Sequence, residues 1–142
     1  MSCSAPAPLI DPMPSVLFIC IANSFRSQMA EAIARSLGGS AWEVASAGSR
    51  PSGIVHPMAQ RLMEEIGLDL SAHRSKGLEA VSGRQWDYVV TMGCGDQCPT
   101  LPATHRLDWE LPDPAGGTLE AARHIRDHIA ARVRELMARA GQ

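Results

Sequence analysis

The sequence predicts an α/β fold, a single domain in which helices flank both faces of a parallel β-sheet. Two observations carry this prediction. Short runs of β-branched and aromatic residues alternate along the chain with longer segments of helical periodicity, which is the pattern of βαβ units. The chain has 142 residues, enough for one domain with a sizeable core, and no internal repeat or long linker divides it. In such sheets, ligands bind at the carboxyl ends of the strands.

The first half of the chain predicts two strands and one helix. Residues 15–21 (SVLFICI) form an apolar run that is typical of a buried parallel strand. A polar turn over residues 22–27 follows, and then a helix that ends at Gly38 and Gly39. Apolar residues recur along this helix at helical spacing: Met29, Ala30, Ile33, Ala34 and Leu37. Residues 42–47 predict the second strand.

The second half predicts two strands and two helices. A helix is expected over residues 57–66, with a proline in its first turn. Residues 87–92 (DYVVTM) indicate a third strand, and residues 106–111 a weaker fourth. The last helix covers residues 118–140, with these residues on its apolar face: Ala122, Ile125, Ile129, Val133, Leu136 and Ala140.

Charge and hydrophobicity exclude several classes of protein. The net charge of −2 provides no basic field for nucleic acid or for a membrane surface. The longest apolar run, residues 16–21, is far too short to span a membrane. Residues 1–14 contain four prolines and no basic start, so they predict a flexible N-terminal tail rather than a signal peptide. We therefore expect a cytoplasmic protein whose domain covers residues 15–142.

Four cysteines stand in the chain, at Cys3, Cys20, Cys94 and Cys98. Four are too few for a disulfide-dense secreted scaffold. In a reducing compartment, paired cysteines more often perform chemistry or bind a metal than cross-link a fold. Cys3 lies in the predicted tail and has no expected role.

The turn after the first strand has the composition of an oxyanion-binding loop. It begins at Cys20 and runs directly into a helix, so successive backbone N–H groups and the helix dipole would face one anion. Arg26 can grip two oxygens of that anion, and the same positive field favours the thiolate form of Cys20 as a nucleophile. Ser27 can donate a hydrogen bond to the thiolate, and Asn23 can brace the loop. The expected substrate-binding residues are Ile21, Ala22, Asn23, Ser24, Phe25, Arg26 and Ser27.

The pattern Cys-x5-Arg-Ser after a first strand resembles the low-molecular-weight protein tyrosine phosphatase superfamily, and residues 23–31 (NSFRSQMAE) resemble its thioredoxin-coupled arsenate reductase branch. Further matches are residues 46–48 (SAG), 55–57 (VHP), 90–94 (VTMGC) and 113–116 (DPAG). The resemblance implies a four-stranded parallel sheet, an arsenate or phosphate-like substrate, and thioredoxin as the partner. It also implies that Asp113 is a catalytic acid, although the sequence around it (LPDP) by itself favours a simple turn.

The remaining cysteines distinguish a reductase from a phosphatase. Reduction of arsenate to arsenite takes two electrons, which thiols must supply, whereas dephosphorylation needs no extra thiol. We expect Cys20 to form an adduct with arsenate and Cys94 to attack Cys20, which releases arsenite. Cys98 then moves the disulfide to Cys94–Cys98, where thioredoxin reduces it. Asp113-Pro114 is followed by Ala115, with no aromatic wall for a tyrosine ring, and this also favours a small inorganic substrate.

Other interpretations stay open at this point. The chain could be a phosphatase whose extra cysteines give redox control, or a reductase that uses a small thiol with a glutaredoxin-like partner. It could also be a non-catalytic module that binds oxyanion or arsenite. A zinc site at Cys94 and Cys98 would need two more ligands, and His105 alone is near in sequence, so no metal is expected.

The chain departs from the family pattern at three positions. Ala22 stands where the loop usually has Gly, which would add strain if that position needs a positive φ. Phe25 replaces a Cys. The reductase branch often binds potassium, and Asn23 matches that site together with Glu31 and Ser46, but Lys76 replaces the expected Asp. We therefore expect no cofactor, with the Lys76 ammonium in the place of the ion, although a solvated surface lysine is an equally acceptable interpretation.

Overall fold

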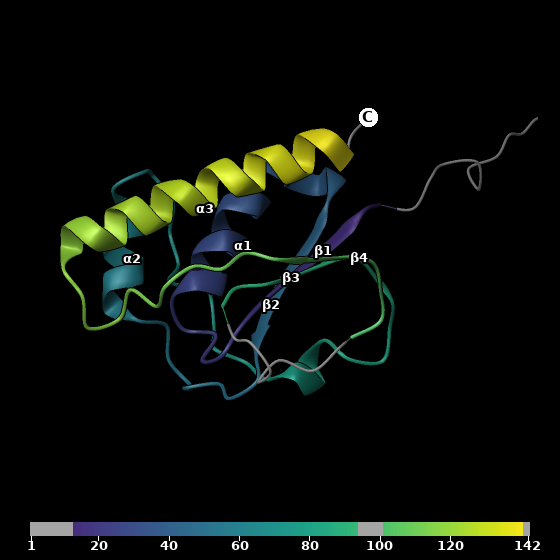
Figure 1. Ribbon diagram of the computed structural model, residues 1–142, viewed down its shortest axis with the longest axis horizontal. Coiled ribbons are helices and arrows are strands. Elements are labelled where there is room, and N and C mark those ends of the chain that lie inside the picture. Colours follow the sequence, from purple (N-terminus) through teal and green to yellow (C-terminus); the bar gives the residue numbers. More distant parts are fainter. Residues whose placement is uncertain (1–12, 94–100, 141–142) are drawn as a thin grey trace, which may run out of the picture.

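The computed structural model describes residues 13–93 and 101–140. Its four strands form one parallel sheet in the order β2-β1-β3-β4 (Figure 1). They are β1 (Ser15–Cys20), β2 (Glu43–Gly48), β3 (Trp86–Thr91) and β4 (Ala103–Asp108). The predicted α/β class and the four-stranded parallel sheet are confirmed.

The central strand β1 explains why its sequence is a continuous apolar run. It pairs with β2 along one edge and with β3 along the other, core clusters cover both of its faces, and all six residues are buried. Side chains alternate between the faces. Val16 and Phe18 enter the larger core cluster, and Leu17 and Ile19 enter the smaller one on the opposite face.

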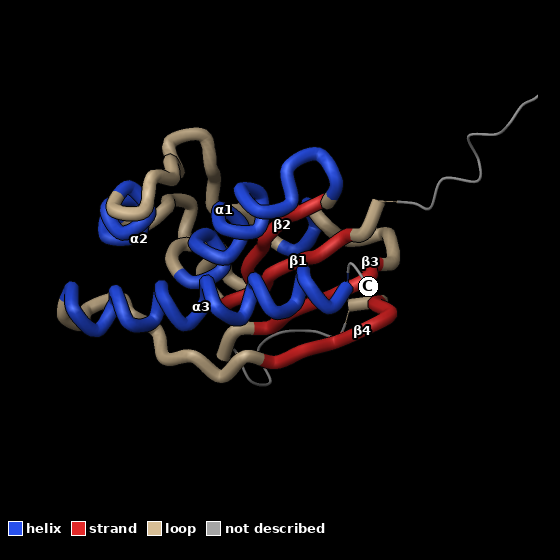
Figure 2. The backbone as a smooth tube through the Cα atoms, turned by 90° about the horizontal axis from the view of Figure 1, so that it is seen from above, coloured by secondary structure: helices blue, strands red, loops and turns tan. Residues whose placement is uncertain are grey.

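Helical elements flank the two faces unequally. The α-helices α1 (Arg26–Gly38), α2 (Pro57–Glu64) and α3 (Leu119–Ala140) contribute to the larger core on one face. The 3-10 helix η3 (Leu78–Ala80) covers part of the other face, where Leu78 packs against the smaller core. Figure 1 shows α3 running over α1, with η3 on the far side of the sheet, and Figure 2 shows the same layers from above. A second 3-10 helix, η2 (Gly39–Ala41), follows α1.

The fourth strand lies three residues earlier than the predicted residues 106–111, which is a correction. The prediction followed the apolar residues Trp109 and Leu111, and both are indeed buried. They come after the end of β4, however, because β4 is an edge strand whose own residues are mostly exposed and polar. The other predicted boundaries agree within two residues, including the start of α3, where the Thr118 side chain accepts a hydrogen bond from the Ala121 N–H.

The predicted tail over residues 1–14 falls almost wholly outside the described residues. Where the description begins, the Pro14 carbonyl accepts a hydrogen bond from the Glu43 N–H, which joins this residue to β2. Within the described ranges, no helix is both long and apolar enough to cross a membrane.

Arg126 on α3 connects that helix to the C-terminal end of α2. It is 8% exposed, and its guanidinium donates to the Leu62 carbonyl, to Glu65 and to Asp127. Hydrogen bonds from Arg123, and then from Arg126, hold the pKa of Glu65 at about 2. We expect Arg126→Leu to lower the free energy of unfolding by about 2 kcal/mol, because it leaves the buried Leu62 carbonyl without this donor.

Urea unfolding at pH 7 measures this effect. Arg139→Leu is the matched control, because the Arg139 side chain is 77% exposed and lies 3.9 Å from Glu135. Equal unfolding midpoints for the two variants would show that the buried guanidinium contributes no more than a surface one.

Candidate active site

The predicted oxyanion loop lies at the carboxyl end of the central strand. Cys20 is the last residue of β1 and is 2% exposed. Residues 21–25 form the loop, and α1 begins at Arg26. Because α1 starts directly at the end of the loop, its N-terminus adds a partial positive charge there.

The five successive carbonyl groups of residues 21–25 each accept a hydrogen bond from an N–H group outside the loop. The bonds run from Arg50 N to Ile21 O (2.8 Å), Ser52 N to Ala22 O (3.0 Å), Gln28 Nε2 to Asn23 O (3.1 Å), His56 N to Ser24 O (3.0 Å) and Met29 N to Phe25 O (3.0 Å). In a trans peptide, the C=O and the following N–H point in opposite directions, and the described residues contain no cis peptide. The N–H groups of the loop are therefore directed away from these partners, toward its interior, as a cradle for an oxyanion.

The side chain of Ser27 is directed at the sulfur of Cys20. The two atoms Ser27 Oγ and Cys20 Sγ are 2.9 Å apart, and Ser27 Oγ accepts a hydrogen bond from Asn23 Nδ2 at 2.8 Å. With the amide donating to it, the hydroxyl proton of Ser27 is free to be donated to a thiolate. The Ser27 hydroxyl therefore links the Asn23 side chain to the sulfur of Cys20.

Asn23 has the one left-handed backbone conformation among the non-glycine residues that the structure describes, with φ of 48°. Ala22 does not have a positive φ, so the backbone strain considered for it does not arise. The positive φ falls on the next residue, Asn23, and asparagine tolerates this conformation. Every polar group of the buried Asn23 side chain is used. Its amide also donates to Ser46 Oγ at 2.9 Å, and its carbonyl accepts from the Lys76 N–H at 2.9 Å and from Gln28. The predicted bracing of the loop by Asn23 fits these contacts.

Gln28 is a loop-supporting residue for which the sequence contains no signal. It is fully buried in the first turns of α1, and its amide nitrogen reaches Asn23 O, Asn23 Oδ1 and Arg74 O. Its carbonyl oxygen lies 3.0 Å from Nδ1 of His73. Burial lowers the pKa of His73, more than the Glu31 charge raises it, so the neutral ring is favoured in this contact.

Arg26 is buried and clamped at one end of its guanidinium. The NH1 group donates to the Met92 carbonyl at 2.7 Å and to the Leu111 carbonyl at 2.8 Å. The Nε–H and NH2 groups remain for a bidentate grip on an oxyanion. Gly93 makes room for this clamp, because a Cβ at that position would lie 2.8 Å from Arg26 NH1 and 2.7 Å from the Leu111 carbonyl oxygen.

A second layer of charge lies behind the loop, around the buried carboxylate of Glu31. Ser46 Oγ donates a short hydrogen bond to Glu31, Arg35 binds it at 2.8 Å, and Lys76 Nζ lies 3.5 Å from it. Burial by itself would raise the pKa of Glu31, but the hydrogen bond from Ser46, the charge of Lys76 and the hydrogen bond from Arg35 together outweigh burial and lower it. Glu31 is therefore an ionised partner for the surrounding cations.

Asp113 lies in the exposed turn before α3. One of its carboxylate oxygens accepts a hydrogen bond from the Ala115 N–H at 3.0 Å, so the side chain forms the turn that the sequence alone suggested. Its role as an acid stays a prediction. Cys94 and Cys98 lie outside the described residues, so the structure gives no geometry for the predicted relay.

His105, the residue considered as a zinc ligand, stacks on the ring of Tyr88, with 4.9 Å between the two ring centroids.

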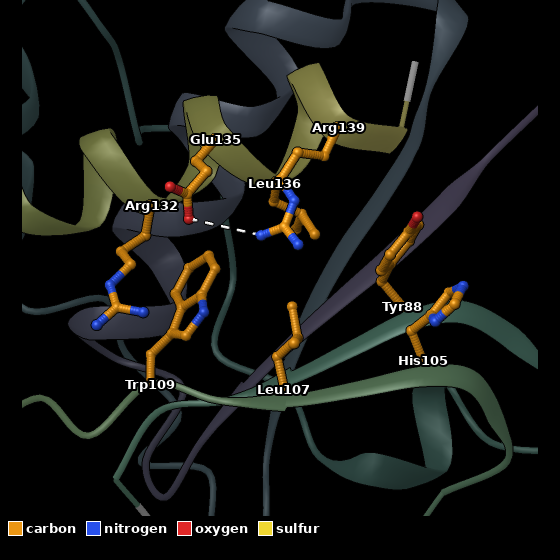
Figure 3. Close-up of a pocket in the computed structure, with 8 residues that line it drawn as sticks. All are labelled: Tyr88, His105, Leu107, Trp109, Arg132, Glu135, Leu136 and Arg139. Carbon is orange, nitrogen blue, oxygen red and sulfur yellow. Dashed lines mark ion pairs between the residues drawn. The ribbon is translucent and has the colours of Figure 1, made fainter. Parts of the chain in front are cut away.

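A separate cavity of about 370 Å³ lies between β4 and α3 (Figure 3). Leu107 and Trp109 line one side, and Arg132 and Arg139 of α3 line the other. None of its lining residues belongs to the loop from Cys20 to Ser27. Among the described residues, the cavity is therefore lined separately from the oxyanion loop.

Comparison with known proteins agrees with this geometry. Residues 15–142 match the family described as low molecular weight phosphotyrosine protein phosphatase. The chain is 40% identical over 130 residues to a protein of Synechocystis sp. named glutaredoxin arsenate reductase. The alignment covers 89% of this chain and 98% of that protein.

Two solved structures are similar to the whole fold. One, described as an arsenate reductase in the phosphate binding state, has a TM-score of 0.80 at 39% identity and covers 89% of this chain and 98% of its own. The other is a thioredoxin-dependent arsenate reductase of Corynebacterium glutamicum, with a TM-score of 0.74 at 38% identity, covering 95% of this chain and 66% of its own.

Proposed function

The chain belongs to the low molecular weight phosphotyrosine protein phosphatase family, and from this premise we propose that it is an arsenate reductase with Cys20 as its nucleophile. The observation that carries the proposal is the cradle itself. Five outward-bound carbonyls turn the loop N–H groups inward, beside the buried Cys20 and the half-free guanidinium of Arg26, and such donors suit one tetrahedral oxyanion. Arsenate has this shape and charge, and the similar proteins named above are arsenate reductases.

The first step forms a covalent bond between Cys20 and arsenic. The thiolate attacks arsenic, and one oxygen leaves as water after accepting protons. The backbone N–H groups and Arg26 bind the remaining oxygens, and the Ser27 hydroxyl holds the thiolate before attack. We assign Asp113 the donation of a proton to the leaving oxygen. The product is a thiol adduct of As(V).

The second step supplies the two electrons. The Cys94 thiolate attacks the sulfur of Cys20, the sulfur–arsenic bond breaks, and its electron pair stays with arsenic. Arsenic leaves as arsenite, As(III), and Cys20 and Cys94 are left as a disulfide. Cys98 then attacks the sulfur of Cys94, which frees Cys20 and forms a Cys94–Cys98 disulfide. The dithiol of thioredoxin reduces this disulfide and is itself oxidised.

A specific observation favours a second reductant. The Synechocystis relative is named a glutaredoxin arsenate reductase, whereas the Corynebacterium structure is of a thioredoxin-dependent one. Thioredoxin remains our proposal, because two cysteines after β3 permit an internal disulfide that a dithiol protein can reduce. Either reductant is found in a reducing compartment, and we place the protein in the cytoplasm.

Arsenate-dependent oxidation of NADPH tests the proposal. The purified protein is assayed with thioredoxin and thioredoxin reductase, and separately with glutathione, glutaredoxin and glutathione reductase. We expect turnover with thioredoxin, and its loss in Cys94→Ser and in Cys98→Ser. Full turnover of Cys98→Ser with glutathione and glutaredoxin would support the second route. Rapid hydrolysis of an aryl phosphate without arsenate turnover would contradict the proposal.

We also propose that the Lys76 ammonium takes the place of a potassium ion behind the loop. Its Nζ lies 3.5 Å from Glu31 Oε1, 3.5 Å from Ser46 Oγ and 3.3 Å from the Arg74 carbonyl oxygen. An ammonium surrounded by these oxygens neutralises Glu31, which would otherwise bind a cation. Glu31 in turn holds Ser46, which accepts the hydrogen bond from Asn23 of the loop.

The wild-type rate should therefore change by less than about twofold when sodium is replaced by potassium at constant ionic strength, because no cation binds selectively to the active protein. Lys76→Met should be slower and should recover activity with potassium. Steady-state assays in chloride salts of the two ions measure both effects. A clear activation of the wild type by potassium would show that Lys76 does not replace the ion.

A further inference from the structure

Residues 49–56, which follow β2, form a rigid collar around the back of the oxyanion loop. The backbone N–H groups of Arg50, Ser52 and His56 bind three carbonyls of the loop. The Gly53 N–H donates to Ser75 Oγ at 3.1 Å, and Ser75 Oγ donates to the Ala22 carbonyl at 2.9 Å. The collar is thus attached to the loop at several points along its length.

The collar presents Ile54 to solvent. This side chain is 65% exposed, more than any other large hydrophobic side chain in the described part of the chain. Its backbone is held on both sides of the residue, because Ser52 Oγ accepts from the Ile54 N–H at 3.3 Å and donates to the Ile54 carbonyl at 2.9 Å. Pro51 and Pro57, close by in sequence, are also exposed. A backbone held in this way loses little conformational freedom when a partner covers the residue.

The sheet topology places the collar beside the position where the predicted relay begins. The last residue of β2, Gly48, is paired with Cys20, and β3 lies on the other side of β1. Neighbouring strands are about 4.8 Å apart, so the ends of β2 and β3 are about 10 Å apart at one edge of the sheet. A stable protein interface covers about 800 Å² of each partner, a patch roughly 30 Å across. A protein bound next to Gly93, which follows the end of β3, would therefore also reach the end of β2, where the collar begins.

We propose that Ile54 is a docking contact for the protein that reduces this enzyme. The inference rests on the proposed function, which requires a protein dithiol to approach the end of the sheet where β3 and the loop terminate. The partner that fits is thioredoxin, the dithiol protein on which the similar Corynebacterium reductase depends. Ile54 contacts the side of thioredoxin that faces the end of β2.

Ile54→Asn tests the contact, and Ile66→Asn is the matched control. Ile66 is the same residue type and is 43% exposed, but it lies near Ser36 and Leu37 at the far end of α1 from the oxyanion loop. The KM for thioredoxin and the KM for arsenate are measured for both variants. A single-turnover reaction without reductant measures the arsenite formed per enzyme.

We expect Ile54→Asn to raise the KM for thioredoxin about tenfold, since one buried apolar side chain contributes on this scale at an interface. The KM for arsenate and the single-turnover yield should stay unchanged, and Ile66→Asn should match the wild type in all three measurements. An unchanged KM for thioredoxin in Ile54→Asn, with normal wild-type turnover, overturns the docking proposal alone. Absence of thioredoxin-dependent turnover in the wild type overturns the thioredoxin route and the docking proposal together.

Discussion

Cys20→Ser is expected to abolish arsenate reduction while leaving the oxyanion cradle intact. The serine hydroxyl is a far weaker nucleophile than a thiolate, and its oxygen cannot form the disulfide that supplies the electrons. The change replaces one buried atom next to Ser27 and leaves the backbone bonds of the loop in place. Turnover should fall at least about 10⁴-fold, as for other enzymes that lose their nucleophile.

Two measurements separate loss of chemistry from loss of the site. The coupled NADPH assay measures turnover, and the increase in melting temperature with added phosphate measures oxyanion binding. The variant should retain the phosphate-dependent increase. Turnover above one-hundredth of the wild-type rate would show that another group is the nucleophile, and loss of phosphate binding would show that the sulfur itself maintains the cradle.

Gly48→Ala should cause the second largest loss, because there is no space for a methyl group at that position. A Cβ on Gly48 would lie 2.5 Å from the Ile21 carbonyl oxygen, 2.8 Å from the Asn23 nitrogen and 3.0 Å from the Ala22 carbonyl carbon. All three are backbone atoms of the oxyanion loop, so the loop has to move. A misplacement of about 1 Å costs on the order of 100-fold in rate, and we expect kcat/KM for arsenate to fall by at least this factor.

Gly117→Ala is the matched control for this experiment. Its Cβ would meet only the Pro114 carbonyl oxygen, at 3.4 Å, which is an ordinary contact. Its activity should remain within about twofold of the wild type, as for most surface substitutions. If Gly48→Ala keeps half of the wild-type kcat/KM, the loop can shift without loss of function, and the account of a fixed cradle is wrong.

The strands and helices were predictable because their signals are local. A strand buried on both faces needs an apolar run, which residues 15–20 contain, and helices α1 and α3 need apolar residues at helical spacing. The edge strand β4 was misplaced because an edge strand carries no such requirement. Its exposed residues are polar, and the nearest apolar signal came from Trp109 and Leu111 beyond its end.

The residues of the candidate site likewise fall into those that local sequence places together and those that only the fold brings in. Cys20, Arg26 and Ser27 are separated by few residues, so the pattern of strand, loop and helix already places them together. The bonds that shape the loop come from Arg50, Ser52 and His56, and the Arg26 clamp depends on carbonyls 66 and 85 residues away. Backbone donors and acceptors are present at every position, so no residue type identifies those that will be used.

The sequence by itself determined the chemistry at the centre of the site. It places a cysteine at the end of a buried strand, an arginine six residues later, and the start of a helix directly after the loop between them. Only the tertiary structure decided the direction of the loop's N–H groups, the closeness of Gly48 to the loop backbone and the position of Lys76 beside Glu31. The physical reason is that nucleophile and dipole follow from the order of neighbouring residues. The orientation of a peptide group is set instead by hydrogen bonds and contacts with segments that only folding brings together.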